Sequence, residues 1–248
     1  MESFIRWIGG KKLLRKKILE QFPPEEGSYE RYIEVFGGAG WVLFAKEQHA
    51  KLEVYNDVNG NLVNLFRCVK YHPEGLDQEL EWVLTSREQF FDAREQIKIR
   101  GMTDIQRAAR FYVLIKQSYG ADTKSFGVSS RNMERAKQYL PKVAERLSKV
   151  VIENVDFEQL IKTYDREKAL FYLDPPYFEA EKYYSNRFAP EDHKRLKNRL
   201  ATLKGQFVLS YNDCEQIREL YKDYKIISVD RWHNLGEGRY NELIIKNF

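Results

Sequence analysis

The sequence predicts an α/β fold in which helices cover both faces of a mostly parallel sheet. Two observations support this prediction: short apolar runs recur along the chain, and segments with helical periodicity follow them. Near-continuous apolar runs of this length are typical of parallel strands buried on both faces. The runs cover residues 31–36, 52–56, 150–154, 169–173 and 206–211. Pro190, followed by two acidic residues, predicts the start of a helix.

Two regions depart from this alternation. The stretch from residue 72 to 147 separates the second run from the third and is far longer than one crossover helix requires. It is mostly helical in pattern, with a Gly- and Ser-containing interruption at 119–130. We therefore expect a core domain of residues 1–71 and 148–248 and an insert of residues 72–147. The second region is the C-terminus, where β-like runs at 225–230 and 241–246 predict a hairpin with an antiparallel strand.

Positive charge gathers in the insert. The chain carries a net charge of +4, but residues 94–149 hold 13 Lys and Arg against 5 Asp and Glu, or 13 − 5 = +8. Such a segment suits a phosphate-bearing partner, although a solvated helical surface explains the charge equally well. The two cysteines and the lack of an apolar run near the roughly 20 residues that span a bilayer favour a reduced, cytoplasmic location without a membrane.

The sharpest motif is Asp174-Pro175-Pro176-Tyr177, directly after an apolar run. Ligands of open α/β sheets bind beyond the carboxyl ends of the strands, where this motif falls. Two prolines remove two N–H donors and leave acceptor-only backbone. A carboxylate, a rigid carbonyl and an aromatic ring together suit a planar amino group. The alternative is a strand-end Asp that begins a Pro-rich turn.

A second motif, Phe36-Gly37-Gly38-Ala39-Gly40, follows the first predicted strand, and we expect it to open the first helix. Its glycines allow close approach of a ligand to the backbone, and a P-loop is excluded because no Gly-Lys-Ser/Thr follows. Asp57 follows the next strand, about 20 positions on, where an acidic side chain can bind ribose hydroxyls. The competing interpretation of Asp57 is a helix N-cap.

Six blocks along the chain resemble the Dam-type (α-group) DNA adenine-N6 methyltransferases in order and spacing. They are residues 4–11, Tyr32–Gly40, Asn56-Asp57, Asp156-Phe157, Asp174–Tyr177 and Leu209–Asn212. The resemblance implies a class I, Rossmann-like sheet of seven strands. It also implies a site-specific transfer of methyl from S-adenosylmethionine, leaving S-adenosylhomocysteine, to N6 of a flipped-out adenine in double-stranded DNA, without a metal.

The same resemblance assigns residues to the site. Asp174, Pro175, Pro176 and Tyr177 would be catalytic. Asp156 would bond the cofactor's adenine amine, Phe157 would stack on that ring, and Phe188 would complete the pocket. Lys11 would meet the cofactor's carboxylate or DNA. The full set of expected cofactor-binding residues is Trp7, Lys11, Glu34, Phe36, Gly37, Gly38, Gly40, Asp57, Asp156, Phe157 and Phe188.

The insert is the expected target-recognition region. Its candidate DNA-binding residues are Lys124, Ser129, Ser130, Arg131 and Asn132, whose types serve phosphates and base edges. Many Dam relatives carry an Asn-Gly-Leu-x-Arg-type string there, whereas this chain has Lys116–Gly127 with a different sequence. The departure leaves open whether GATC is the target. The sequence predicts no obligate protein partner and does not reveal a restriction endonuclease.

Other functions fit the sequence less well. Methylation of cytosine C5 needs a cysteine nucleophile, usually after Pro, but Cys68 follows Arg67 and Cys214 follows Asp213. Cytosine-N4 enzymes usually have Ser, and protein-glutamine methyltransferases Asn, where this chain has Asp174. RNA stays open as the polymer. A DNA-binding module without catalysis would not need the motif, and a nucleotide-dependent oxidoreductase leaves it unexplained. Cys68 and His72 have a metal-ligand spacing, but no second pair completes a site.

Overall fold

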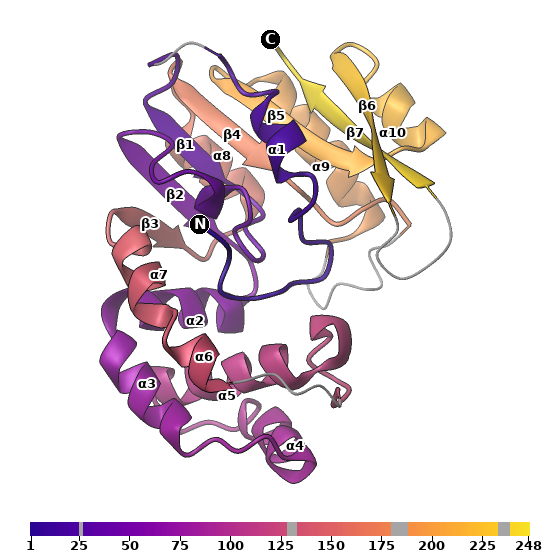
Figure 1. Ribbon diagram of the computed structural model, residues 1–248. Coiled ribbons are helices and arrows are strands. Elements are labelled where there is room, and N and C mark those ends of the chain that lie inside the picture. Colours follow the sequence, from indigo (N-terminus) through magenta and orange to yellow (C-terminus); the bar gives the residue numbers. More distant parts are fainter. Residues whose placement is uncertain (25–26, 128–132, 180–187, 233–238) are drawn as a thin grey trace. The chain divides into compact units, whose positions relative to one another are not determined.

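The structure is a computed structural model that describes residues 1–24, 27–127, 133–179, 188–232 and 239–248, with the backbone alone at 231, 232, 239 and 240. Within these ranges seven strands form one sheet in the order β3-β2-β1-β4-β5-β7-β6 (Figure 1). The strands are β1 (Arg31–Glu34), β2 (Leu52–Asn56), β3 (Val150–Glu153), β4 (Ala169–Leu173), β5 (Gln206–Asn212), β6 (Lys225–Trp232) and β7 (Arg239–Lys246).

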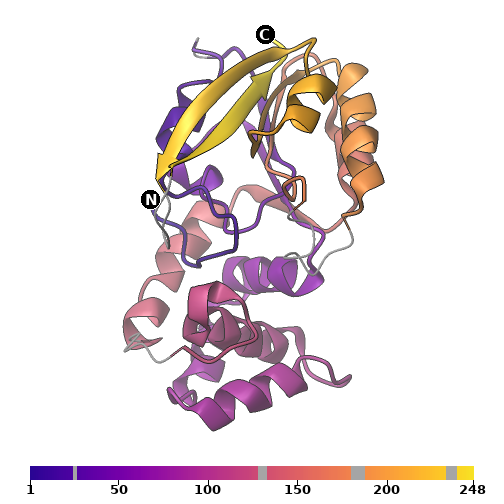
Figure 2. The same ribbon diagram turned by 90° about the vertical axis from the view of Figure 1, so that its right-hand side faces the viewer.

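The sheet is mixed. β1 pairs in parallel with β2 and β4, and β4 pairs in parallel with β5. β7 is antiparallel to both β5 and β6, and the two last strands run side by side as a hairpin (Figure 2). Both the predicted α/β class and the predicted C-terminal hairpin are confirmed.

Helices occupy most of the remaining described chain. They are α1 (Arg15–Leu19), α2 (Gly60–Tyr71), α3 (Pro73–Glu81), α4 (Arg87–Gln96), α5 (Asp104–Gln117), α6 (Met133–Lys137), α7 (Leu140–Leu147), α8 (Phe157–Tyr164), α9 (Pro190–Ala201) and α10 (Glu215–Leu220), with 3-10 turns η1 (Leu43–Ala45) and η2 (Tyr119–Ala121). α9 begins at Pro190 as predicted, and Asp192 accepts from the Ala189 N–H to complete the cap.

The chain divides into two compact units. The first contains residues 1–10, 38–47 and 59–154, and the second contains residues 11–37, 48–58 and 155–248. These units do not share their boundaries with the predicted core domain and insert, and that functional division stays a prediction. We call them the helical unit and the sheet unit.

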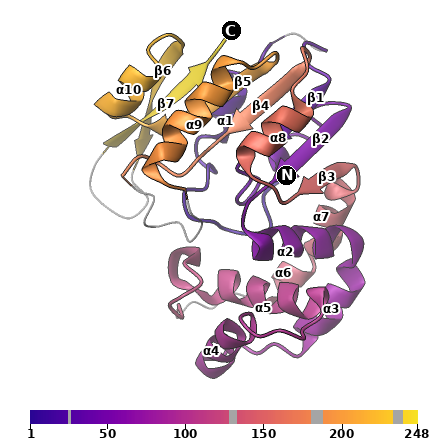
Figure 3. The same cartoon turned by 180° about the vertical axis from the view of Figure 1, so that it is seen from behind.

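The core of the sheet unit lies between the sheet and α8, α9 and α10. α8 and α9 lie on one face of the sheet and α1 on the other (Figures 1 and 3). β4 is buried at all five positions, because helices or loops cover both of its faces. Leu160, Ile161, Leu196 and Leu200 of α8 and α9 pack on apolar side chains of the strands. Because β4 is held in the centre of the sheet, the position of Asp174, which directly follows it, is fixed as well.

The helical unit is held by α5, whose buried face carries Ala108, Phe111, Tyr112 and Ile115. A capping box between Thr103 and Gln106 fixes the start of this helix.

The glycine motif does not open an α-helix, contrary to prediction. Gly38 and Gly40 have φ of +50° and +67°, values that no right-handed helix accommodates. The chain therefore turns twice before it forms the three-residue 3-10 turn η1.

Asn56 joins the ends of two strands to the segment before α8. It is 1% exposed. Its amide donates to the Val35 and Val155 carbonyls at 2.9 and 3.1 Å, and its carbonyl accepts from the Val155 N–H at 3.0 Å. One side chain thereby satisfies three backbone groups, one buried and two partly buried, that lie where the parallel strands end.

We predict that Asn56→Ala lowers the free energy of unfolding by about 2–4 kcal/mol, because it leaves these three backbone groups without partners. Urea unfolding followed by circular dichroism measures the change. The control is Asn198→Ala on the exposed side of α9, which should change stability by less than about 0.5 kcal/mol. Equal effects of the two substitutions would contradict a bridging role of Asn56.

Candidate active site

The predicted catalytic motif lies at the carboxyl edge of the sheet, directly after β4. The Asp174 side chain is 16% exposed, and its Oδ1 is 2.8 Å from the Lys11 ammonium and accepts from the Ser210 hydroxyl at 2.9 Å. Burial raises the pKa of Asp174, while Lys11 and the Ser210 hydroxyl oppose that rise. Among the described residues no group donates to the second oxygen, Oδ2. A buried carboxylate with one open acceptor suits a neutral N–H donor.

The loop after Asp174 is clamped to β5. Asn212 accepts from the Phe178 N–H at 3.0 Å and donates to the Phe178 carbonyl at 3.3 Å. The Tyr177 ring lies 6.2 Å from that of Tyr211, and the Lys11 ammonium lies 4.6 Å from the Tyr177 ring centre. Pro175 and Pro176 stand between these two anchored points, so the loop has little freedom. A turn-starting Asp alone would not explain this arrangement.

Three predicted cofactor-binding residues meet around Tyr55. Burial raises the pKa of Tyr55, and the negative charges of Asp57 and Glu34 raise it further. A Cβ on Gly37 would come within 2.2 Å of the Tyr55 ring, so only glycine fits there. The N-cap of α2 is Asn59, which accepts from two N–H groups of the first turn. The competing interpretation of Asp57 as a helix cap is therefore wrong.

Glu34 has a structural partner as well. It is 2% exposed, and its carboxylate accepts from the Tyr32 hydroxyl at 2.6 Å. Burial, and then this carboxylate, raise the pKa of Tyr32 well above its ordinary value.

The three predicted aromatic residues form one cluster. The ring centres of Phe36, Phe157 and Phe188 are 5.6 to 5.9 Å apart in each pair. The Arg195 guanidinium lies over the ring of Phe157, 4.2 Å from its centre. The proximity of the three rings is compatible with their assignment to one pocket, and their part in cofactor binding stays a prediction. The sequence gave no reason to include Arg195.

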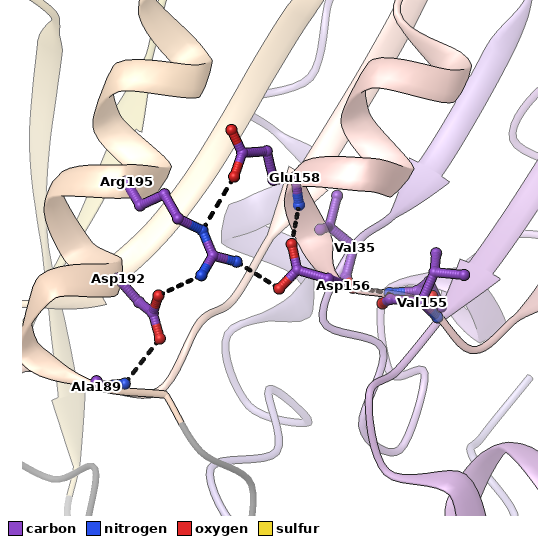
Figure 4. A network of polar contacts seen from close by, with 8 residues as sticks. Val35, Val155, Asp156, Glu158, Ala189, Asp192 and Arg195 are labelled. Carbon is purple, nitrogen blue, oxygen red and sulfur yellow. Dashed lines mark hydrogen bonds and ion pairs between the residues drawn. The ribbon is translucent and has the colours of Figure 1, made fainter.

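Asp156 lies beside this cluster in a network of polar contacts (Figure 4). It caps α8 by accepting from the Glu158 N–H at 2.9 Å, and it pairs with Arg195. Arg195 also binds Asp192 at 2.6 Å and Glu158 at 3.1 Å. The guanidinium thus ties α9 to the start of α8, and it holds Asp156 next to the ring of Phe157.

Trp7, Gly38 and Gly40 belong to the helical unit. A Cβ on Gly38 would lie 3.0 Å from the Trp7 ring, and a Cβ on Gly40 would lie 3.1 Å from Phe44. The Trp7 ring also contacts Phe111 edge-on. These contacts explain the glycines through packing and do not test their predicted part in cofactor binding.

The interruption after α5 forms an anchored loop, Gln117–Gly127. The Tyr119 N–H donates to the Ser125 carbonyl, and the Gly127 N–H to the Gln117 carbonyl. The positive φ angles of Ala121 and Thr123, +63° and +58°, are strained for residues with a side chain. Asp122 compensates by accepting from the N–H groups of Lys124 and Ser125.

Contacts from α4 hold this loop in place. The Arg94 guanidinium donates to the Lys124 carbonyl at 2.9 Å, and Phe90 packs edge-on against Phe126. The Lys124 side chain is exposed. The other predicted DNA-binding residues, Ser129, Ser130, Arg131 and Asn132, lie outside the described residues.

Many basic side chains of the insert are already paired. Arg107 binds Asp104, Arg110 binds Glu79, and Lys137 lies between Asp77 and Glu134. Two of these acidic partners, Glu79 and Asp77, lie before residue 94, so they offset part of the +8 of residues 94–149.

Cys68 is no candidate nucleophile. Its burial raises the pKa of the thiol to about 11, so the thiol is protonated near neutral pH. In the described ranges, no group of three or more His, Cys, Asp or Glu side chains is placed to hold a metal ion. No helix in those ranges has the length and apolar character that crossing a membrane requires.

Four functional candidates were not assigned from the sequence: Ser210, Asn212, Arg195, and Glu242, whose Oε2 lies 3.9 Å from the Lys11 ammonium. Ser210 and Asn212 belong to the block Leu209–Asn212, which supported the family resemblance but received no role of its own. In the structure they bind Asp174 and Phe178. Glu242 had one signal that could have found it, since it is an acid directly before the apolar run Leu243–Ile245.

Comparison with known proteins agrees with this geometry. Residues 7–235 match the family described as D12 class N6 adenine-specific DNA methyltransferase. The whole chain is 27% identical to the type II methyltransferase M1.LlaDCHI of Lactococcus lactis subsp. cremoris, covering 96% of that protein. It is 25% identical to the type II methyltransferase M.CviBI of Paramecium bursaria Chlorella virus NC1A over the full length of both. A DNA adenine methylase of Haemophilus influenzae is 22% identical over 98% of this chain and 91% of that protein.

Proposed function

The chain belongs to the D12 class of N6 adenine-specific DNA methyltransferases and methylates adenine in DNA. We propose that its methyl donor is S-adenosylmethionine and that its target is an adenine flipped out of double-stranded DNA. The observation that carries this proposal is the buried Asp174, followed by two prolines and Tyr177, at the carboxyl edge of the sheet. The family assignment excludes the alternative functions considered above: methylation of cytosine, methylation of protein glutamine, and nucleotide-dependent oxidation or reduction.

On the target side, each group has one task. Oδ2 of Asp174 and the Pro175 carbonyl accept the two N–H groups of the adenine amine, while the Tyr177 ring stacks on the base. Both acceptors draw on the protons and direct the nitrogen lone pair away from the ring. Flipping costs a few kcal/mol of stacking and pairing, which the pocket contacts offset.

On the donor side, the residues present fit the cofactor. Asp57 and Glu34 offer carboxylates for ribose hydroxyls or an ammonium group, and Asp156 offers an acceptor for an adenine amine. The cluster of Phe36, Phe157 and Phe188 offers aromatic faces. When bound, S-adenosylmethionine supplies a methyl group carried on a positively charged sulfur. The proposed roles of Trp7, Gly38 and Gly40 stay predictions.

The transfer balances without a covalent enzyme intermediate. N6 would receive the methyl group that the bound donor supplies, the donor's sulfur would become neutral, and one N6 proton would be released. Asp174 takes this proton, and its raised pKa makes the carboxylate a better acceptor than an exposed one.

On the DNA side, we propose that the loop Gln117–Gly127 and residues 128–132 contact the duplex. Lys124 is exposed on a loop whose backbone is fixed by Asp122 and Arg94, which suits a phosphate contact in a defined register. Two of the relatives are named type II methyltransferases, and we propose that this chain methylates a defined DNA site in the cytoplasm. Its loop sequence gives no support for GATC in particular.

We predict that Asp174→Ala slows methyl transfer at least about 100-fold while cofactor binding survives, because one preorganised acceptor is removed. Tritiated methyl incorporation into DNA measures the rate, and calorimetry measures binding. Asp174→Asn keeps the shape but loses the charge and should be equally slow. Incorporation at a near wild-type rate in either variant would overturn the proposed catalytic role.

We predict that Asp57→Ala weakens S-adenosylmethionine binding by about 1.5–3 kcal/mol, because a buried charged acceptor is lost. A calorimetric titration gives the affinity. Asp92→Ala is the matched control, since that aspartate is exposed on α4. Unchanged affinity in Asp57→Ala would remove it from the cofactor site.

We predict that Lys124→Ala weakens binding to all DNA sequences alike and reduces the salt slope by about one unit, as loss of a phosphate contact does. Arg131→Ala should relax preference at one base position and cost about 1–3 kcal/mol there. Binding to a randomised oligonucleotide pool at several salt concentrations separates the two effects. Lys162→Ala, an exposed lysine on α8 outside the basic segment, is the control. No effect of either variant would place recognition elsewhere.

A further inference from the structure

A third charged residue accompanies Lys11 and Asp174. Glu242 is 3% exposed, and its Oε2 lies 3.9 Å from the Lys11 ammonium, which is itself 4% exposed. Glu242 comes from the first half of β7 and is paired in register with Asn212 at the end of β5. Because β7 is antiparallel, its beginning lies at the edge where the parallel strands end. The last strand thereby brings a side chain to the catalytic loop.

This arrangement places one cation between the buried carboxylate of Glu242 and the largely buried carboxylate of Asp174. A buried charge is costly, and an apolar side chain in the same position is often the more stable choice. The residues that follow Glu242 in β7, Leu243 to Ile245, are buried and apolar as expected. A carboxylate at this one position therefore calls for a functional explanation. Glu242 also contributes to raising the pKa values of Asp174 and Tyr177.

The contacts of Asp174 with Lys11 and Ser210 determine how its carboxylate is oriented. Lys11 and Ser210 both meet Oδ1, which fixes the side-chain rotation and turns Oδ2 away from them. A lysine with one carboxylate partner can approach both oxygens of that partner. A lysine shared with a second carboxylate, and with its ammonium 4.6 Å from the Tyr177 ring centre, is held to one side.

We propose that Glu242 is a positioning residue for methyl transfer, which holds the Lys11 ammonium against Oδ1 of Asp174 and so keeps Oδ2 available to the target amine. This inference rests on the proposed catalytic role of Asp174. It assigns no contact with DNA or cofactor to Glu242, which acts through Lys11.

The test is Glu242→Gln, which keeps the shape of the side chain and removes its charge. We expect kcat to fall about 10-fold or more, because the acceptor loses its orientation, while S-adenosylmethionine and DNA affinities stay within about twofold. Glu242→Asp should recover part of the loss. Thermal melting of each variant checks that it is folded.

The pH profile separates positioning from a merely structural role. The charged and titratable groups that face Asp174 are Lys11, Glu242, Tyr172 and Tyr177. Transfer requires ionised Asp174, so kcat falls as pH drops through its pKa. Glu242→Gln removes a negative charge that raises this pKa, and the acid limb should move to lower pH. Ser210→Ala removes a hydrogen bond that lowers the pKa, so its limb should move to higher pH.

Two further comparisons complete the test. Glu53→Gln removes another 2%-exposed glutamate, which accepts from the His49 N–H, and it should leave the acid limb in place. Lys11→Gln combined with Glu242→Gln should be no slower than Lys11→Gln alone, because Glu242 acts through Lys11.

Three results would overturn the inference: an unchanged kcat and acid limb in Glu242→Gln, a loss traced to weaker cofactor or DNA binding, or multiplicative effects in the double variant. Failure of the proposed function looks different, since Asp174→Ala would then stay active. An inactive Asp174→Ala with a normal Glu242→Gln refutes this inference alone.

Discussion

The ion pair between Asp174 and Lys11 is the interaction on which the arrangement of the site depends. β4 is buried at every position, so the residue after it enters a region with little water. A carboxylate there needs partners, and the chain supplies them from two distant segments: Lys11 before α1 and Ser210 from β5. The sheet order that brings these segments together is therefore the one that makes an ionised Asp174 tolerable. Glu242 of β7 lies on the other side of Lys11, and its negative charge opposes the ionisation of Asp174.

Much of this fold was predictable because its determinants are local. Buried parallel strands are continuous apolar runs, and all five predicted runs form strands, as do the two runs of the hairpin. Asp174 could be placed at the carboxyl edge since it directly follows such a run. The glycine motif was harder, because Gly38 and Gly40 serve sharp turns with positive φ and not a helix start. Spacing alone does not distinguish these two uses of glycine.

The residues that sequence reasoning missed depend on contacts between segments far apart in the chain. Glu242 reaches the loop after β4 only through the antiparallel register of β7 with β5, in which it is opposite Asn212. Arg195 contacts Asp156 because α9 packs against the start of α8 (Figure 4). It also lies over the ring of Phe157. An arginine on a helix surface is ordinary in a sequence, and nothing nearby in the chain marks it. Asp57 was ambiguous for the opposite reason, because the true cap, Asn59, is only two residues away.

The net charge of residues 94–149 overstates the positive charge that this segment leaves unpaired, since some of its acidic partners lie before residue 94. Arg107, Arg110 and Lys137 each lie beside an acidic side chain that offsets part of their charge. Lys124 differs, because it lies on a loop with strained backbone at Ala121 and Thr123 that Asp122 and Arg94 hold in one conformation. A fold retains such strain where a fixed presentation is useful. If this loop contacts DNA as proposed, its defined shape is what would discriminate between sequences, whereas net positive charge would add only nonspecific attraction.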